Sequence, residues 1–533
     1  MSAPATQEHL GRIARGGAVG MAGAVFSAVS SFALVVIVTR GFTPGEAGLF
    51  FAVTSVFLVL AAASSLGSDT GLARFLQRYE AQGRHDDVRR AVRAAAVPAL
   101  VVSTFSALVL VVGAGPVSGA LGLEERGESL LRWLALALPF AVAADLALAV
   151  TRAFGRMRIS VLVDRFLRAG LQPPLALVVV LAGGTLLAAA GAWAAAYVVS
   201  AAVALVASRR YLRTRLTRHR TDGPVPVRER VDGLPMAGAG TPLSVRREFW
   251  GFTWPRGVAR LAQITVQKAD IVIVAALLSP AHAAVYTAAT RFVALGQFAT
   301  HAIQQVLQPR LTAILIHDDQ DTLRQVFRIA TTWSILLAWP LYLVVGTAPL
   351  VYLSVFGDQY AAAAEDASGV AVVAVMAVAM LVSVAAGPLD TVLLMAGRSR
   401  ASLGNALTAM TVDLVLCFLL IPVVGLVGAA LAWGAAVLAR TALTLVQVRR
   451  HLGVTPGGRA VIVASVLPVV CLAVPVATHS LLGAGTLGGF ALVLGVGAVA
   501  YLGALFVFRR LLGLDLLVQA VVPLRLRRWV YDV

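Results

Sequence analysis

The feature that most constrains this chain is a recurrence of apolar runs of about 20 residues along its whole length. A run of that length crosses the roughly 30 Å hydrocarbon core of a bilayer as one helix, and a helix satisfies its own backbone hydrogen bonds there. Hydrophobic residues make up 59% of the 533 residues and charged residues only 13%, which excludes an ordinary water-exposed surface. We therefore predict an all-α, polytopic membrane protein without a separate soluble domain.

The runs predict about fourteen transmembrane helices, with edges uncertain by a few residues. The predicted spans are 17–39, 47–66, 94–115, 130–151, 160–182, 186–207, 249–277, 284–307, 327–346, 367–389, 400–421, 424–446, 460–480 and 486–508. The basic leader before the first span is similar to that of a signal peptide. The span is too long for one and has no distinct small-residue cleavage site, so we predict a retained helix.

The net charge of +18 would indicate nucleic-acid binding in a soluble protein, but here the arginines lie mainly between the apolar runs. They recur in every second loop, for example at Arg89 and Arg90, whereas the loop around Glu125 is acidic. This alternation follows the positive-inside rule and supports an even number of helices. We predict that both termini face the cytoplasm, that the lipid bilayer surrounds the chain, and that nucleic acid is not a partner.

The chain repeats itself at an offset of about 236 to 242 residues. The matching pairs are Thr43 to Phe50 with Ser279 to Tyr286, Gly155 to Ser160 with Gly397 to Ser402, Arg74 with Arg310, and Trp193 with Trp433. Because each copy has six helices, we predict two lobes of the same orientation, related by a pseudo-two-fold axis along the membrane normal. The predicted lobes are 1–219 and 246–451, joined by a Pro- and Gly-rich cytoplasmic linker, 220–245. Two extra transmembrane helices and a basic tail follow in 452–533.

Several segments resemble a known family. They are Arg40 to Gly48, Asp270 before Ser279 to Tyr286, Val355 to Tyr360, Gly397-Arg398, and Ile421 to Ala430. At these positions the chain resembles the polysaccharide transporter family, the Wzx-type flippases of lipid-linked sugars. Its superfamily also contains multidrug and toxin extrusion (MATE) transporters and lipid II flippases. The resemblance implies a MATE-like fold, export of a polyprenyl-diphosphate-linked saccharide across the bacterial cytoplasmic membrane, and association with polysaccharide assembly enzymes.

Polar residues form a stripe along the span 249–277. Arg256, Arg260, Gln263, Gln267 and Asp270 follow one another at i, i+4, i+7, i+11 and i+14, which places them on one helix face. A polar face on an apolar helix is typical of a helix that lines water. Arg260 has an alternative role, because it could pair with Asp270 or with another helix and only fix the packing.

The next span carries a second stripe. It consists of Thr290, Gln297, His301, Gln304 and Gln308, with Arg291 beside it. Guanidinium groups bind phosphate oxygens in a fork geometry, and amides and histidine hydrogen-bond sugar hydroxyls. The predicted substrate-binding residues are therefore Arg256, Arg260, Gln263, Gln267, Arg291, Gln297, His301 and Gln304. Arg256, Arg291 and Lys268 could instead extend to the membrane surface.

Four aspartates within or at the edges of predicted spans are candidates for ion coupling, namely Asp145, Asp270, Asp390 and Asp413. A carboxylate in the membrane can take up a proton or a sodium ion and so couple transport to an ion gradient. Each could instead neutralise an arginine, such as Arg165, Arg168 or Arg440.

No catalytic chemistry is indicated. Cys417 and Cys471 both lie in predicted spans, and we find no metal-ligand cluster, phosphate-binding glycine loop or nucleophilic triad, so no metal, cofactor or catalytic residue is predicted. We predict a flippase that works by alternating access. One alternative is a multidrug antiporter, which would favour an acidic, aromatic-lined pocket. The other is a membrane-embedded saccharide polymerase or ligase, which would need a large outer loop.

Overall fold

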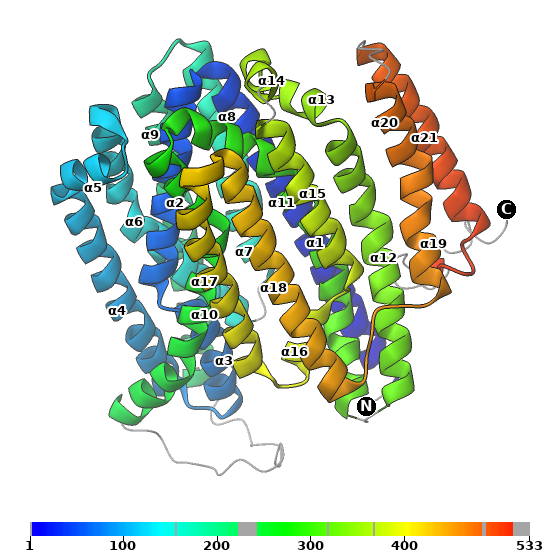
Figure 1. The fold of residues 1–533 in the computed structure, drawn as a ribbon. Helices are drawn as coiled ribbons and strands as arrows, with labels where there is room; N and C mark the ends of the chain where they lie inside the picture. Colours follow the sequence, from blue (N-terminus) through cyan, green and yellow to red (C-terminus); the bar gives the residue numbers. More distant parts are fainter. Residues whose placement is uncertain are drawn as a thin grey trace. The chain divides into compact units, whose positions relative to one another are not determined.

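The computed structural model describes residues 3–154, 157–221, 242–316, 319–365, 368–481 and 487–514. All regular secondary structure in these ranges is helical (Figure 1). The chain divides into two compact units. Unit 1 comprises Met1–Ala288 and Asp413–Ala429, and unit 2 comprises Ala289–Val412 and Ala430–Val533.

Unit 1 is built around one central helix. Its elements are α1 (Ala3–Gly41), α2 (Pro44–Ser65), α3 (Ser68–Ala81), α4 (His85–Val112), α5 (Ala114–Ala120), α6 (Glu124–Ala153), α7 (Met157–Ser160), the π-helix η1 (Val161–Arg168), α8 (Ala169–Leu181), α9 (Leu186–Thr221) and α10 (Pro242–Leu277). It also includes the first residues of α11 (Pro280–Ile316) and parts of α17 (Ser399–Val424) and α18 (Leu426–Leu452). The alanine-rich α6 packs against α2, α3, α4 and α9, because small side chains let membrane helices approach closely.

Unit 2 is organised around α12. It contains the rest of α11, α17 and α18 together with α12 (Gln320–Thr347), α13 (Pro349–Ser354), α14 (Asp358–Glu365), α15 (Ser368–Ala385), α16 (Leu389–Met395), α19 (Arg459–Pro468), the π-helix η2 (Val469–Ala473), α20 (Val474–Leu481) and α21 (Leu487–Val507). Helix α12 packs against α15 and α19. The Tyr501 hydroxyl on α21 donates a hydrogen bond to the Leu336 carbonyl (2.8 Å), and the Trp333 indole donates to the Leu512 carbonyl (3.3 Å). The two extra C-terminal helices thus pack onto α12.

The all-α, polytopic membrane fold predicted from the sequence is confirmed. Eleven helices in the described part of the chain are long and apolar enough to cross a membrane. The predicted spans 160–182, 249–277 and 284–307 are also helical, but they are not among the eleven. Each of these three contains charged residues, such as Asp164, Arg260 and Arg291, which lower its hydropathy. The number fourteen therefore stays a prediction.

The first matching pair of the repeat has the same local structure in both copies. Thr43 caps α2, since its hydroxyl accepts a hydrogen bond from the Glu46 amide (3.3 Å), and the Thr43 amide donates one to the Glu46 carboxylate (3.2 Å). Ser279 caps α11 in the same way by accepting from the His282 amide (3.3 Å). The duplicated sequence thus encodes a duplicated helix start.

The two units do not coincide with the predicted lobes, because α10 and the beginning of α11 pack with unit 1. The lobe boundaries and the pseudo-two-fold axis stay predictions. Most of the predicted linker, residues 222–241, lies outside the described residues. Its last residues, 242–245, belong to α10, which begins seven residues before the predicted start.

Two glycines allow a close crossing within unit 1. Leu66 and Gly67, between α2 and α3, adopt left-handed conformations with φ of 52° and 70°. Gly257 of α10 lies against them, so that a Cβ atom at Gly257 would be 2.7 Å from the Leu66 carbonyl carbon and oxygen. This contact fixes the position of Arg256 and Arg260 along α10 relative to the beginning of α3.

Candidate functional site

The polar stripe on α10 runs from exposed to buried. The side chain of Arg256 is half-buried, those of Arg260, Gln263 and Gln267 are exposed, and that of Asp270 is buried with 4% exposure. Three successive members of the stripe thus remain accessible, and its last member is buried. This is the arrangement expected of a helix that borders water inside a membrane protein.

The second stripe lies on the part of α11 that belongs to unit 2. Arg291, Gln297 and Gln304 are half-buried, and His301 is exposed. The side chain of Gln308 lies outside the described part of the chain. Because the stripes of α10 and α11 fall in different units, their predicted union into one wall stays a prediction.

Two arginines of unit 1 share one aromatic ring. The guanidinium carbon of Arg74 on α3 lies 4.2 Å from the centroid of the Phe252 ring, and that of Arg256 lies 5.9 Å from the same centroid. Neither guanidinium forms an ion pair within the described ranges. We call Arg74 and Arg256 the basic pair. Two uncompensated guanidinium groups beside an aromatic ring can receive an anion.

One turn further along α10, Arg260 enters a network of charges. It forms a long ion pair with Asp69 of α3 (3.9 Å), and 48% of its side chain is exposed. The electrostatic neighbours of Asp145 on α6 include Asp69, Asp164, Arg168 and Arg260. Two predicted candidates, Asp145 and Arg260, are therefore brought together. The predicted alternative partner of Arg260, Asp270, does not pair with it among the described residues.

The same network includes a π-helical turn. Within η1, Arg168 donates to Asp164 through Nε (3.0 Å) and Nη2 (2.7 Å), and its Nη1 donates to the Tyr197 hydroxyl (3.2 Å). Four residues of α8 separate the turn from Pro173 and Pro174, which lack amide hydrogens and so remove hydrogen bonds from the helical turn before them. Single π-helical turns are frequent at functional sites.

Three buried polar side chains of unit 1 form a second cluster, which we call the carboxyl pair site: Asp270 of α10, Tyr286 of α11 and Asp413 of α17. The Tyr286 hydroxyl donates to Asp270 Oδ2 (2.6 Å), and the Ile271 amide donates to Oδ1 (2.8 Å). Asp413 has 0% exposure, and neither of its carboxyl oxygens has a hydrogen-bond partner in the described part of the chain. It is an electrostatic neighbour of Asp270.

The fourth candidate aspartate, in unit 2, is compensated. Arg440 of α18 donates to Asp390 Oδ2 (2.5 Å), and the Ser402 hydroxyl donates to Oδ1 (2.9 Å). Arg440 is one of the arginines that the sequence offered as an alternative partner. Asp390 therefore differs from Asp413, which has no such contact.

Sequence reasoning missed two members of the charge network, Asp164 and Asp69, and named Arg168 only as a possible partner of a candidate aspartate. Asp164 and Arg168 are four residues apart, a spacing that predicts an ion pair on a helix and could have identified them. Asp69 had no comparable signal, because it follows a break between helices that the hydropathy does not mark. Within the described ranges, no three His, Cys, Asp or Glu side chains lie so as to hold a metal ion.

Comparisons with known proteins agree with the resemblance predicted from the sequence. A family described as "Polysaccharide biosynthesis protein" matches residues 239–365, which contain α10 and both polar stripes. No curated protein sequence matches.

Several solved structures share the fold. The lipid II flippase MurJ in an inward closed conformation aligns with a TM-score of 0.67 and 10% identity, over 92% of this chain and 99% of MurJ. An inward-facing MATE-family multidrug transporter of the MOP superfamily has a TM-score of 0.59 and 14% identity, over 82% of this chain and 98% of the transporter. A MOP superfamily transporter from Pyrococcus furiosus has a TM-score of 0.52 and 15% identity, over 83% of this chain and 95% of the transporter. The MATE-like fold is thereby confirmed, and the matched structures are named as transporters or flippases rather than as enzymes.

Proposed function

We propose that this protein is a membrane transporter that flips a polyprenyl-diphosphate-linked saccharide from the cytoplasmic to the outer leaflet by alternating access. The basic pair carries the proposal. Arg74 and Arg256 flank Phe252 without a carboxylate partner within the described ranges, and the accessible side chains of Arg260, Gln263 and Gln267 continue along the same helix.

The order of groups along α10 suits such a substrate. A diphosphate carries several oxygens that guanidinium groups bind in pairs, and a sugar offers hydroxyls that amides bind. The family match over residues 239–365 and the MurJ-like fold support the same substrate class. In this proposal the basic loops face the cytoplasm, so that the lipid diphosphate enters at the basic pair.

A multidrug antiporter is favoured less. Acidic and aromatic groups that could attract a cationic drug meet at the carboxyl pair site, where Tyr286 and Asp413 have 0% exposure. The carboxylates of the charge network have arginine neighbours instead. A drug-sized molecule could not reach the carboxyl pair site without displacing the surrounding helices. A proton or a sodium ion is small enough to do so.

We propose that the carboxyl pair site binds the coupling ion. A buried ionised carboxylate without partners costs several kcal/mol, and a second carboxylate beside it raises that cost. A bound proton or sodium ion would remove it. Asp390 is already compensated by Arg440, and Asp145 has arginine neighbours, so Asp270 and Asp413 are the better candidates.

The substrate proposal is tested by Arg256→Gln and Arg260→Gln in a host whose chromosomal copy is deleted, with surface polysaccharide as the readout. Loss of one charge-assisted hydrogen bond is worth about 1.5–3 kcal/mol, and we expect roughly a tenfold or greater fall in export from each substitution. Lysine at the same positions should restore part of the export.

The matched control is Arg398→Gln with Arg400→Gln, which removes the same charge from an exposed turn of unit 2. Export in the control should equal that of the wild type at equal protein level. Wild-type export in both α10 variants would refute the assigned substrate site.

A further inference from the structure

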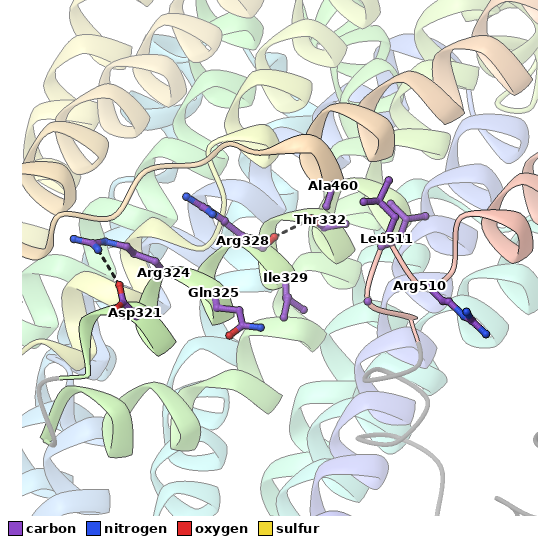
Figure 2. Close-up of a pocket in the computed structure, with 11 residues that line it drawn as sticks. Asp321, Arg324, Gln325, Arg328, Ile329, Thr332, Ala460, Arg510 and Leu511 are labelled. Atoms are coloured by element: carbon purple, nitrogen blue, oxygen red, sulfur yellow. Dashed lines mark hydrogen bonds and ion pairs between the residues drawn. The ribbon is translucent and has the colours of Figure 1, made fainter.

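Unit 2 contains a basic cavity of about 600 Å³ that the proposed transport path does not use. It lies between the beginning of α12, the beginning of α19 and the segment after α21, and its lining residues include Arg324, Arg328, Ala460, Arg510 and Leu511 (Figure 2). The candidate membrane spans of these helices begin at Gln320 and Arg459 and end at Val507. The cavity therefore opens at one boundary of the apolar layer.

The charge of the cavity is unbalanced. Among the described residues that line it, three are arginines and Asp321 is the one acidic residue. Asp321 accepts from Arg324 (3.1 Å), with 94% of its own side chain exposed, and Arg324 also donates to the Gly453 carbonyl (3.3 Å). Arg328 and Arg510 form no ion pair within the described ranges. Two positive charges thus remain for a ligand.

The three arginines lie on two sides of the cavity, and in Figure 2 the guanidinium groups of Arg324 and Arg328 point away from that of Arg510. Figure 2 shows Arg324 and Arg328 extending from successive turns of α12, while Arg510 projects from the segment after α21. That segment is held in place, since the Trp333 indole donates to the Leu512 carbonyl (3.3 Å). The cavity is therefore framed by fixed backbone, and its arginines are long side chains that can turn toward a ligand.

A helix start adds to the positive potential. Helix α19 begins at Arg459, and its first amide bonded to a preceding carbonyl is that of Ile462, which donates to Gly458 (3.2 Å). The amide of Ala460, which lines the cavity, has no partner within the helix. Helix starts of this kind favour bound anions.

One edge of the cavity is apolar, and we call it the apolar rim. Leu511 lines the cavity there and is 46% exposed, and Val507 and Phe508, which precede it in the chain without lining the cavity, are 74% and 40% exposed. A soluble anion would gain nothing from these side chains. A phospholipid would place its phosphate among the arginines and the beginning of its acyl chains against the apolar rim.

We propose that this cavity binds a phosphate-bearing anion, and specifically the headgroup of an anionic phospholipid. The bound lipid joins α12 to α19 and to the segment after α21, and so holds the two C-terminal helices against α12. This site shares no residue with the proposed substrate path in unit 1, and its proposal does not depend on that path.

The test uses the purified full-length protein in detergent and measures its thermal unfolding temperature during titration with phosphatidylglycerol or phosphatidylcholine. We expect phosphatidylglycerol alone to raise the unfolding temperature. In Arg328→Gln with Arg510→Gln the half-saturating lipid concentration should rise by about tenfold or more, since two charge-assisted contacts are lost. Both side chains are exposed, so the variant should fold, and lysine at the two positions should recover most of the binding.

Arg398→Gln with Arg400→Gln is the control, because it removes the same charge from residues that do not line the cavity. The same phosphatidylglycerol dependence in the cavity variant and the wild type would overturn the proposal. A third titration uses inorganic phosphate at constant ionic strength. If phosphate alone gives the full shift and the cavity variant loses it, the anion site is supported and the lipid source is overturned. The readout is binding, so failure of the transport proposal would leave this result unaffected.

Discussion

Substitution of two aspartates, Asp413→Asn and Asp390→Asn, should separate stability from ion binding. Neither carboxyl oxygen of Asp413 has a hydrogen-bond partner among the described residues, so asparagine loses no contact there and removes a buried charge. We expect the ion-free variant to be at least as stable as the wild type. Asp390→Asn instead weakens the bond from Arg440 (2.5 Å). Because about a third of each side chain is exposed, we expect a loss of about 1–2 kcal/mol in the free energy of unfolding.

A bound ion should add to the free energy of unfolding, and this increment should distinguish the two variants in the opposite way. An ion present at 100 times its dissociation constant adds about 2.7 kcal/mol to the free energy of unfolding. The measurement is the unfolding of the purified protein with sodium replaced by choline at constant ionic strength, repeated over a range of pH. We expect the wild type and Asp390→Asn to keep the increment and Asp413→Asn to lose it. If the increment in the free energy of unfolding depends on pH and not on sodium, the coupling ion is a proton.

Two results would contradict this reasoning. If Asp413→Asn keeps the full increment, the ion does not bind at the carboxyl pair site. If Asp413→Asn is less stable than the wild type by more than about 2 kcal/mol, its carboxylate has a partner that stabilises it, and the argument from an uncompensated charge fails.

Two further predictions concern helix positions. Gly257→Ala should lower export and the unfolding temperature together, because the added Cβ would lie 2.7 Å from the Leu66 carbonyl and force α10 away from α3. The control is Gly251→Ala, where an added Cβ meets open space. Hydrogen bonds from the side chain and amide of Thr322 hold the pKa of Asp319 below its usual value. The ionised Asp319 therefore stabilises the start of α12 above about pH 4, and this stabilisation is lost as the pH falls through the lowered pKa. The difference in unfolding temperature between the wild type and Asp319→Ala should therefore shrink with acidification, whereas Asp319→Asn, which keeps a capping side chain, should not show this pH dependence.

The sequence predicted the membrane fold well because the constraint is simple. A bilayer admits long apolar helices, and such runs can be recognised from hydropathy alone. Short elements escaped prediction for the same reason. Helix α3 and the left-handed turn at Leu66 and Gly67 lie between candidate spans, where hydropathy gives no signal.

The candidate site could be predicted only along single helices. Helical spacing placed Arg256 and Arg260 on one face, and the accessible side chains of Gln263 and Gln267 lie on the same stripe. Pairings between helices are set by packing, so the sequence offered Asp270 as a partner for Arg260, whereas the structure places Asp69 there. Neighbours such as Asp413 and Asp270 come from helices far apart in the sequence, and a spacing rule cannot find them.

Helix α10 carries both proposed sites, and this gives a physical route for coupling. Arg256 and Asp270 are fourteen residues apart, about 21 Å along a helix. Because Tyr286 and Asp413 lie on other helices of unit 1, an ion at the carboxyl pair site would change the forces on one end of α10 while the substrate acts near the other. Coupling free energies of about 1–3 kcal/mol are typical, and they are reciprocal. A substrate diphosphate should therefore tighten or weaken ion binding by the same factor by which the ion changes substrate affinity. Unequal factors in the two binding titrations would mean that α10 does not link the two sites at equilibrium.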